Sequence, residues 1–190
     1  MLNQLIYDFA LWIDESRWST LLHESYYMYS WVETTHVLSL ILSLGMLFFI
    51  DLRMLGFVLP QVPATAIARR LRLPMLIGFG LMIISGLLLF YAIPVRNAQS
   101  VWFRIKFLLL LGAAVNALVF HRRMRQSVAG WDSAPLAPKN IRFGAALSLL
   151  FWTLIVVCGR LIAYDWYDCA YRQSGLINVF AGCIDGQTQF

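Results

Sequence analysis

The sequence predicts an all-α membrane protein: a bundle of four transmembrane helices preceded by an amphipathic helix. Two observations lead to this fold class. Of the 190 residues, 60% are hydrophobic and only 13% are charged, and the mean hydropathy is +0.68. A soluble domain of this size needs a far more charged surface. The hydrophobic residues also gather in four runs, each as long as the roughly 20 residues that a helix needs to cross a bilayer.

The segment before the first apolar run predicts a different kind of helix. Between Leu5 and Leu22, large apolar residues such as Phe9 and Trp12 stand among polar ones. This pattern is typical of a helix that lies on the membrane surface, and the acids within it argue against a signal peptide. We therefore expect an interfacial helix in residues 1–29, a transmembrane domain in residues 30–164 with spans at 30–50, 73–93, 101–120 and 143–164, and a tail in residues 165–190.

The charges of the connecting segments predict the orientation of the chain. Residues 51–72 contain four cations and residues 121–142 contain five, against only two acids, Asp51 and Asp132. Because cytoplasmic loops carry an excess of Lys and Arg, both loops should face the cytoplasm of a bacterial inner membrane. Both ends of the chain then lie on the periplasmic side. These loops also account for the sequence pI of about 9.4, so the basic charge does not indicate nucleic-acid binding.

The cysteines agree with this orientation. Cys169 and Cys183 both belong to the predicted periplasmic tail, where an oxidising compartment lets thiols pair. We expect a disulfide between them, with a metal site or redox pair as the alternative. Cys158 falls within the fourth predicted span and is interpreted as a small core residue.

Ionisable residues near the outer ends of the predicted spans are the candidate functional site. His36 is about five residues deep, or roughly 8 Å at the helical rise. Ionisable side chains inside a membrane are costly and face the bundle interior or a cavity. One interpretation is a satisfied ion-pair network whose cations extend toward the headgroups. The other is a cofactor site, and its candidate residues are Glu33, His36, Arg104, Lys106 and Arg160.

The cofactor with the best match to these residue types is b-type haem. His36 would bind the iron, and the cations at Arg104, Lys106 and Arg160 would neutralise the propionates. His36 is the only histidine inside a predicted span, so the second axial ligand is left open. Its candidates are Met28, Met82 and His23, or the chain supplies no second ligand.

Signatures of soluble enzymes do not support another activity. Gly78 and Gly80 form an isolated GxG within a span, without the third glycine or the strand of a nucleotide-binding fingerprint. The sequence contains no P-loop, HExxH or nucleophile elbow, so neither a kinase nor a hydrolase is indicated. Whether the chain is an enzyme is left open.

Three stretches of the chain resemble known membrane proteins. Residues 31–55 (WVETTHVLSLILSLGMLFFIDLRML), 102–111 (WFRIKFLLLL) and 158–164 (CGRLIAY) look like an uncharacterised family of small bacterial inner-membrane proteins with four spans. More distantly, the pattern is similar to membrane haem-b protoporphyrinogen oxidases and to copper-resistance D proteins. That resemblance implies His36 as a haem or metal ligand, Arg53 as a supporting cation and Lys106 as an essential lysine. The longer N-terminal helix and the cysteine-bearing tail depart from both groups, so the resemblance is carried to the site and not to a substrate.

The sequence thus leads to a functional hypothesis with two alternatives. We expect a b-type-cytochrome-like protein that binds haem near the outer face and relays electrons or protons to a quinone or a periplasmic redox protein. The first alternative is a non-catalytic membrane subunit whose N-terminal helix and tail dock a periplasmic partner. The second is a copper-handling membrane protein. Beyond the lipid bilayer, the sequence leaves open whether the chain forms an oligomer or joins a larger complex.

Overall fold

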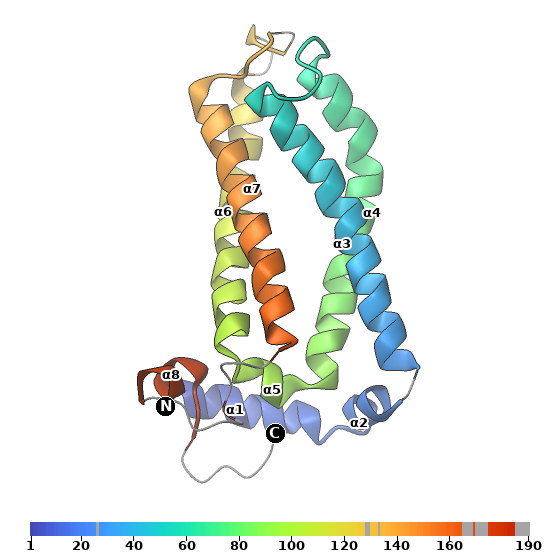
Figure 1. Cartoon of the computed structure of the whole chain (residues 1–190), viewed down its shortest axis with the longest axis vertical. Coiled ribbons are helices and arrows are strands. Elements are labelled where there is room, and N and C mark those ends of the chain that lie inside the picture. Colours follow the sequence, from blue (N-terminus) through green and yellow to red (C-terminus); the bar gives the residue numbers. More distant parts are fainter. Residues whose placement is uncertain (26, 128–129, 133, 165–168, 170–174, 185–190) are drawn as a thin grey trace. The chain divides into compact units, whose positions relative to one another are not determined.

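A computed structural model of the chain is all-helical over the residues that it describes, which are 1–25, 27–127, 130–132, 134–164, 169 and 175–184. Four long helices are labelled in Figure 1: α3 (Met28–Leu55), α4 (Ala64–Ala92), α6 (Val101–Ser127) and α7 (Lys139–Ile162). Each is long and apolar enough to cross a membrane. The predicted fold class is confirmed at this level. The orientation of the termini stays a prediction, and most of the predicted tail lies outside the described residues.

The helices extend beyond the predicted spans at most of their ends. The largest difference is in α4, which begins at Ala64, nine residues before the predicted span, and continues through Pro74. The added turns carry Arg69, Arg70 and Arg72, so hydropathy alone could not assign them to the helix. At the other end of the preceding loop, α3 is followed by Gly56 with φ +86°, the left-handed conformation common just past a helix C-terminus.

The N-terminal segment forms two helices where the sequence pattern predicted one. They are α1 (Leu2–Asp14) and α2 (Arg17–Glu24). Ser16 separates them because it has extended backbone angles and its hydroxyl accepts the Ser19 N–H at 3.2 Å. That bond satisfies one of the amide donors left over at a helix start.

The contacts of the chain divide it into two compact units, and each long helix contributes to both. Unit 1 consists of Met1–His36, Ile83–Leu108 and Val156–Phe190; unit 2 consists of Val37–Met82 and Leu109–Ile155. Unit 1 therefore holds both termini and the α4–α6 connection, and unit 2 holds the loops that follow α3 and α6.

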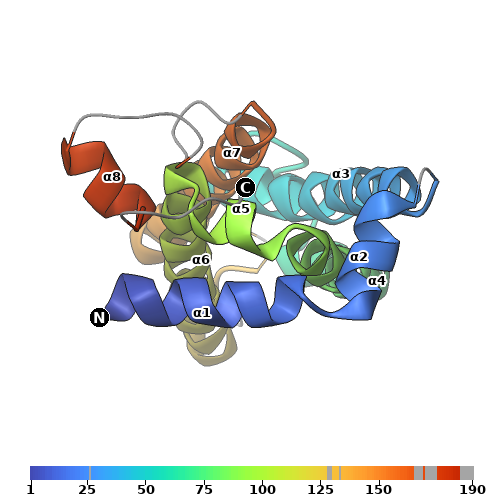
Figure 2. The ribbon, with the colours of Figure 1, turned by 90° about the horizontal axis from the view of Figure 1, so that it is seen from below.

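In unit 1, the short helix α5 (Pro94–Ala98) lies along α1, as Figures 1 and 2 both show. Pro94 starts α5, a position where its missing N–H costs nothing. The two helices bury Ala10, Val95 and Ala98 between them. The opposite side of α1 exposes Leu5 and Trp12 at 68% and 72%, which agrees with an amphipathic helix. The C-terminal helix α8 (Gly175–Ala181) completes the unit.

Unit 2 contains the larger hydrophobic core. It combines the end of α3, the start of α4, the segment around Trp131 and the start of α7, with Met54, Ile141 and Ala145 almost fully buried. Along the remaining surface of the long helices, large apolar side chains such as Leu73 and Leu118 are exposed at 68% and 62%. Exposed apolar side chains of this density are expected where lipid is the solvent.

Candidate functional site

His36 lies in α3 and faces small residues of α4. Its Nδ1 is 3.0 Å from the Ser85 hydroxyl oxygen, and a Cβ added at Gly86 would lie only 3.2 Å from its Cε1. The imidazole is half-buried, and Ser85 is buried. Glycine at position 86 therefore makes room for the ring, and Ser85 fixes its orientation.

The same pairing of faces recurs in unit 2. There a Cβ added at Gly78 would lie 3.1 Å from the Cβ of Ser43. In both contacts the residue number rises on α3 as it falls on α4, as an antiparallel pair of helices requires. The polar stripe of α3 thus packs against the small residues of α4, which is how membrane helices approach closely.

Lys106 belongs to a second group in unit 1, formed by α6 and α7. Its Nζ lies 3.6 Å from where a Cβ on Gly159 would be, and it interacts electrostatically with Cys158. Cys158 is a free thiol with 5% of its surface exposed. A glycine on α7 therefore lets the half-buried Lys106 side chain lie against that helix.

Arg104 forms a third group at the junction of α1, α5, α6 and α8. Its Nε donates to the Ala98 carbonyl oxygen at 3.1 Å, and its Nη1 donates to Asn3 Oδ1 at 3.1 Å. Gly182 packs so closely on the guanidinium that a Cβ there would clash with it, and its φ of +78° also favours glycine. Arg104 thus joins α1, α5 and the residue that follows α8, and its role as a propionate partner stays a prediction.

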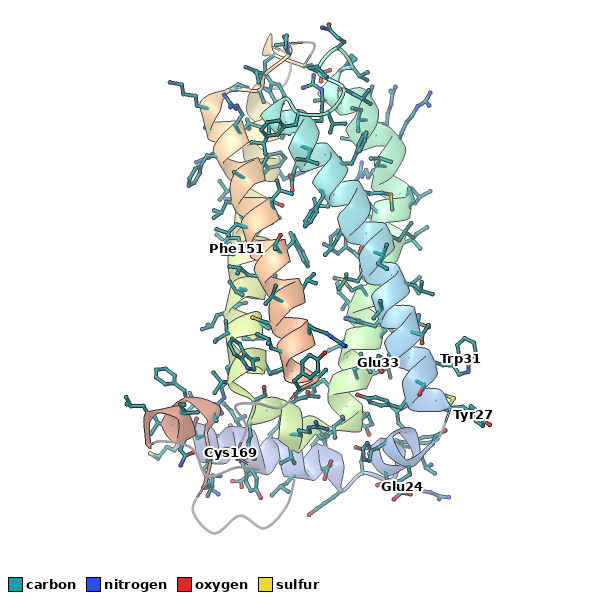
Figure 3. All side chains as sticks on the ribbon, viewed as in Figure 1. Glu24, Tyr27, Trp31, Glu33, Phe151 and Cys169 are labelled. Atoms are coloured by element: carbon teal, nitrogen blue, oxygen red, sulfur yellow. A yellow bond between two sulfur atoms is a disulfide. The ribbon has the colours of Figure 1, made fainter. Side chains whose placement is uncertain are left out.

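Arg160 and Glu33, the remaining predicted site residues, are exposed. Arg160 Nη2 donates to the Tyr164 hydroxyl at 2.9 Å, and its guanidinium lies 4.9 Å from the centre of that ring. Glu33, labelled near the start of α3 in Figure 3, interacts with Tyr29, which also interacts with Arg96 of α5. The five predicted site residues therefore belong to separate local groups of contacts within unit 1.

The predicted disulfide is present between Cys169 and Cys183, 14 residues apart. The Cys169 sulfur also lies 3.9 Å from the Gln99 carbonyl oxygen, just past α5, and Asn3 Nδ2 donates to the Val179 carbonyl oxygen at 3.4 Å. Figure 3 labels Cys169 near α1. The disulfide thus ties the segment around α8 to the same part of unit 1 that Arg104 holds.

Sequence reasoning missed the partners of these residues, and it named Arg53 of unit 2 only as a supporting cation, without its burial. Arg53 is fully buried and donates from Nε to the Val62 carbonyl oxygen at 2.8 Å and from Nη2 to the Ala134 carbonyl oxygen at 3.1 Å. It joins the loops after α3 and α6. Its place within FIDLRM, at the end of an apolar run, is equally typical of an exposed cytoplasmic cation, so the sequence did not reveal that Arg53 is buried.

In a comparison with known proteins, a family model matches most of this chain. The model of a family described as "Family of unknown function (DUF6644)" matches residues 12–165. The chain belongs to the DUF6644 family. No curated protein and no solved structure matches the chain.

The DUF6644 match covers one part of unit 1 and not another. It includes His36 with its partners on α4, and Lys106 with its partners on α7, as well as all four long helices. Asn3, α8 and both disulfide cysteines lie outside it.

Proposed function

We propose that this chain is a bacterial inner-membrane protein that binds b-type haem through His36 and takes part in electron transfer. One observation carries the proposal: a half-buried imidazole on an apolar helix is held at Nδ1 by Ser85 and accommodated by Gly86. Metal-bound histidines characteristically use their second ring nitrogen to hold a neighbouring group, which fixes the orientation of the ring. With Ser85 at Nδ1, iron would bind at Nε2.

The donor set favours haem over a bare metal ion. Among the described residues, no group of three or more His, Cys, Asp or Glu side chains could hold a metal ion. A porphyrin brings four nitrogens of its own, so the protein needs to supply only one or two axial ligands. His36 supplies one, and Met28 and His23, which belong to the same unit as His36, are candidates for the other.

The cations of unit 1 would have distinct tasks in such a site. Lys106 is half-buried, and an ammonium group within the apolar region is stabilised by an anionic group such as a propionate. Arg160 has the reach and exposure to serve the same purpose, whereas Arg104 is occupied by Asn3 and Ala98. A bound haem would supply one-electron transfer, with a membrane quinone or a periplasmic redox protein as the electron donor or acceptor. The distant resemblance to haem-b protoporphyrinogen oxidases supports the same roles for His36 and Lys106.

Absorption spectra of oxidised and dithionite-reduced protein test this proposal. The wild type, produced with a supply of haem, should show a Soret band and a reduced α-band. His36→Ala should lose both bands. His121→Ala should keep them, because His121 is an exposed histidine of α6 that has no part in the proposed site. A folded wild type without a Soret band, in native membranes as well as after purification, would refute haem binding. A His36→Ala protein with an unchanged spectrum would refute the ligand assignment.

A second candidate, a membrane subunit that docks a periplasmic partner, is favoured by α8. This helix exposes Leu176, Val179 and Phe180 at 76%, 67% and 68%, while the disulfide and Asn3 hold it in place. A photo-crosslinking residue at position 180 distinguishes whether a protein partner or lipid covers this face. Crosslinks to a defined protein would support the docking subunit, and crosslinks to lipid alone would mark α8 as a membrane-surface helix.

A further inference from the structure

Unit 2 buries a carboxyl group that the proposed haem site does not use. Asp51 lies near the end of α3, four residues before the helix ends at Leu55, and only 3% of its surface is exposed. A carboxylate removed from water is strongly destabilised unless a cation or several hydrogen-bond donors compensate for its charge. The surroundings of Asp51 therefore decide which form of the group the fold can hold.

Among the described residues, the Asp51 carboxyl group meets one hydroxyl and has no ion-pair partner. The Ser148 side chain of α7 hydrogen-bonds to the carboxyl group, while Oδ2 has no hydrogen-bond partner among the described residues. Arg53, two residues further along α3, is directed to the loop carbonyl oxygens of Val62 and Ala134. Among the described residues, no ion pair joins Asp51 to Arg53, to Arg142 of α7 or to His121 of α6.

The hydroxyl that contacts Asp51 belongs to a polar connection through α7. One turn before Ser148, the Gly144 carbonyl oxygen accepts a hydrogen bond from Asn116 Nδ2 of α6 at 3.0 Å. A Cβ at Gly144 would lie only 3.0 Å from the Phe120 ring, so α6 and α7 are closely packed there. Polar groups of α3, α6 and α7 thus meet within the core of unit 2, where a satisfied site would hold the three helices together.

We propose that Asp51, with the Ser148 hydroxyl, is a proton-binding site between α3 and α7 in the buried part of unit 2. The proton occupies Oδ2, the oxygen without a partner, and Ser148 donates to the other oxygen. On release, the Oδ2–H bond breaks, the proton passes to water, and the electron pair stays on the carboxylate, which the Ser148 hydroxyl stabilises. The inference goes beyond the haem proposal and does not depend on His36.

Infrared difference spectroscopy of the purified full chain in lipid nanodiscs at neutral pH tests this site directly. The wild type should show the C=O stretch of a carboxylic acid. The band should be absent in Asp51→Asn, shifted in frequency in Ser148→Ala, and shifted in ²H₂O because the proton exchanges. Asp51→Asn should also unfold within a few degrees of the wild type, because the neutral amide resembles the protonated acid. If Asp51→Asn does not fold, Asp51→Glu should keep an acid band at a changed frequency.

Asp132 provides the matched control in the same unit. It accepts two hydrogen bonds from Thr65, at 2.8 Å from the backbone N–H and 2.5 Å from the hydroxyl, so that each of its oxygens, unlike Asp51 Oδ2, has a donor. Asp132→Asn should leave the acid band unchanged. The proposal is overturned if no acid band depends on Asp51, if the band does not respond to Ser148→Ala, or if it fails to shift in ²H₂O. None of these measurements requires bound haem, so the two proposals can fail separately.

Discussion

The two units of this chain hold their charged groups in different ways. In unit 1, Arg104 bonds to groups of α1 and α5, and a disulfide closes the segment around α8. In unit 2, one fully buried arginine joins two loops through their backbone carbonyl oxygens. Unit 1 thus depends on chain ends and a covalent link, and unit 2 on one side chain. The comparison teaches that cations near the ends of apolar runs can join separate segments of the chain, with a covalent link beside them in unit 1 and without one in unit 2.

Replacing Arg53 should have the largest effect on stability. Arg53→Ala removes a fully buried side chain and leaves the part-buried carbonyl oxygens of Val62 and Ala134 without their donor; an unsatisfied buried group costs about 1–3 kcal/mol. We expect a loss of about 3 kcal/mol or more, measured as a lower unfolding temperature in detergent. Arg53→Lys should recover only part of the lost stability, because an ammonium group lacks the planar set of N–H donors that a guanidinium group directs at both carbonyl oxygens.

The exposed Arg70 of α4 is the control for this prediction. Arg70→Ala removes a cation from the same loop region and should change the unfolding temperature little. Equal effects of Arg53→Ala and Arg70→Ala would mean that net loop charge, and not the buried contacts, stabilises unit 2.

Loss of the disulfide should have the next largest effect, confined to unit 1. Cys183→Ser opens a loop of 14 residues, and closing a loop of about this length contributes about 3 kcal/mol in the chain-entropy model. Hydrogen exchange of α8 should accelerate strongly, while exchange in the core around Ile141 stays at its wild-type rate. Faster exchange in both units would mean that the disulfide stabilises unit 2 as well as unit 1. Cys158→Ser, which affects only the free thiol, is the control.

Several of these features followed from the sequence because they depend on local or compositional physics. Apolar runs of membrane length have few alternatives to a spanning helix, and two cysteines on one predicted side of the membrane suggested their pairing. The Ser85 and Gly86 contacts of His36 could not be predicted, because they depend on the register of α4 against α3. The Asn3–Arg104 bond joins residues 101 positions apart, a contact that no local pattern encodes.

Other features were missed, one of them although a signal was present. Arg53 was counted with the cytoplasmic cations, since a charge count treats a buried and an exposed arginine alike. The break at Ser16 has a serine that accepts the amide of the third residue after it, which is a recognised start of a helix. Amphipathic spacing alone passed over it because the pattern of apolar residues continues on both sides.

Two glycines of α4, one in each unit, should respond differently to alanine. At Gly78 the new Cβ would lie 3.3 Å from the Ser43 backbone nitrogen, which cannot move without shifting α3, and we expect a loss of about 1–2 kcal/mol. At Gly86 it meets only the His36 ring, which can rotate, so stability should change less while the imidazole is displaced. Gly80→Ala, with nothing within 4 Å of the new Cβ, is the control for helix propensity.

Unfolding temperatures and the Soret band together distinguish the effects of Gly78→Ala and Gly86→Ala. Gly78→Ala should lower the unfolding temperature and leave the spectrum unchanged, and Gly86→Ala should shift or weaken the Soret band. If Gly78→Ala instead changed the spectrum as much as Gly86→Ala, close packing in unit 2 would control the haem site, and the two units would not be separable.

The smallest effect should come from the cap between α1 and α2. The Ser16 hydroxyl accepts the Ser19 amide and lies 2.6 Å from the Tyr91 hydroxyl of α4. Ser16→Ala removes both contacts and should cost about 1 kcal/mol, seen as faster hydrogen exchange of the first amides of α2. Tyr91→Phe removes only the second contact and should leave those amides protected. Equal acceleration in both variants would mean that the tyrosine contact, and not the cap, positions α2 in unit 1.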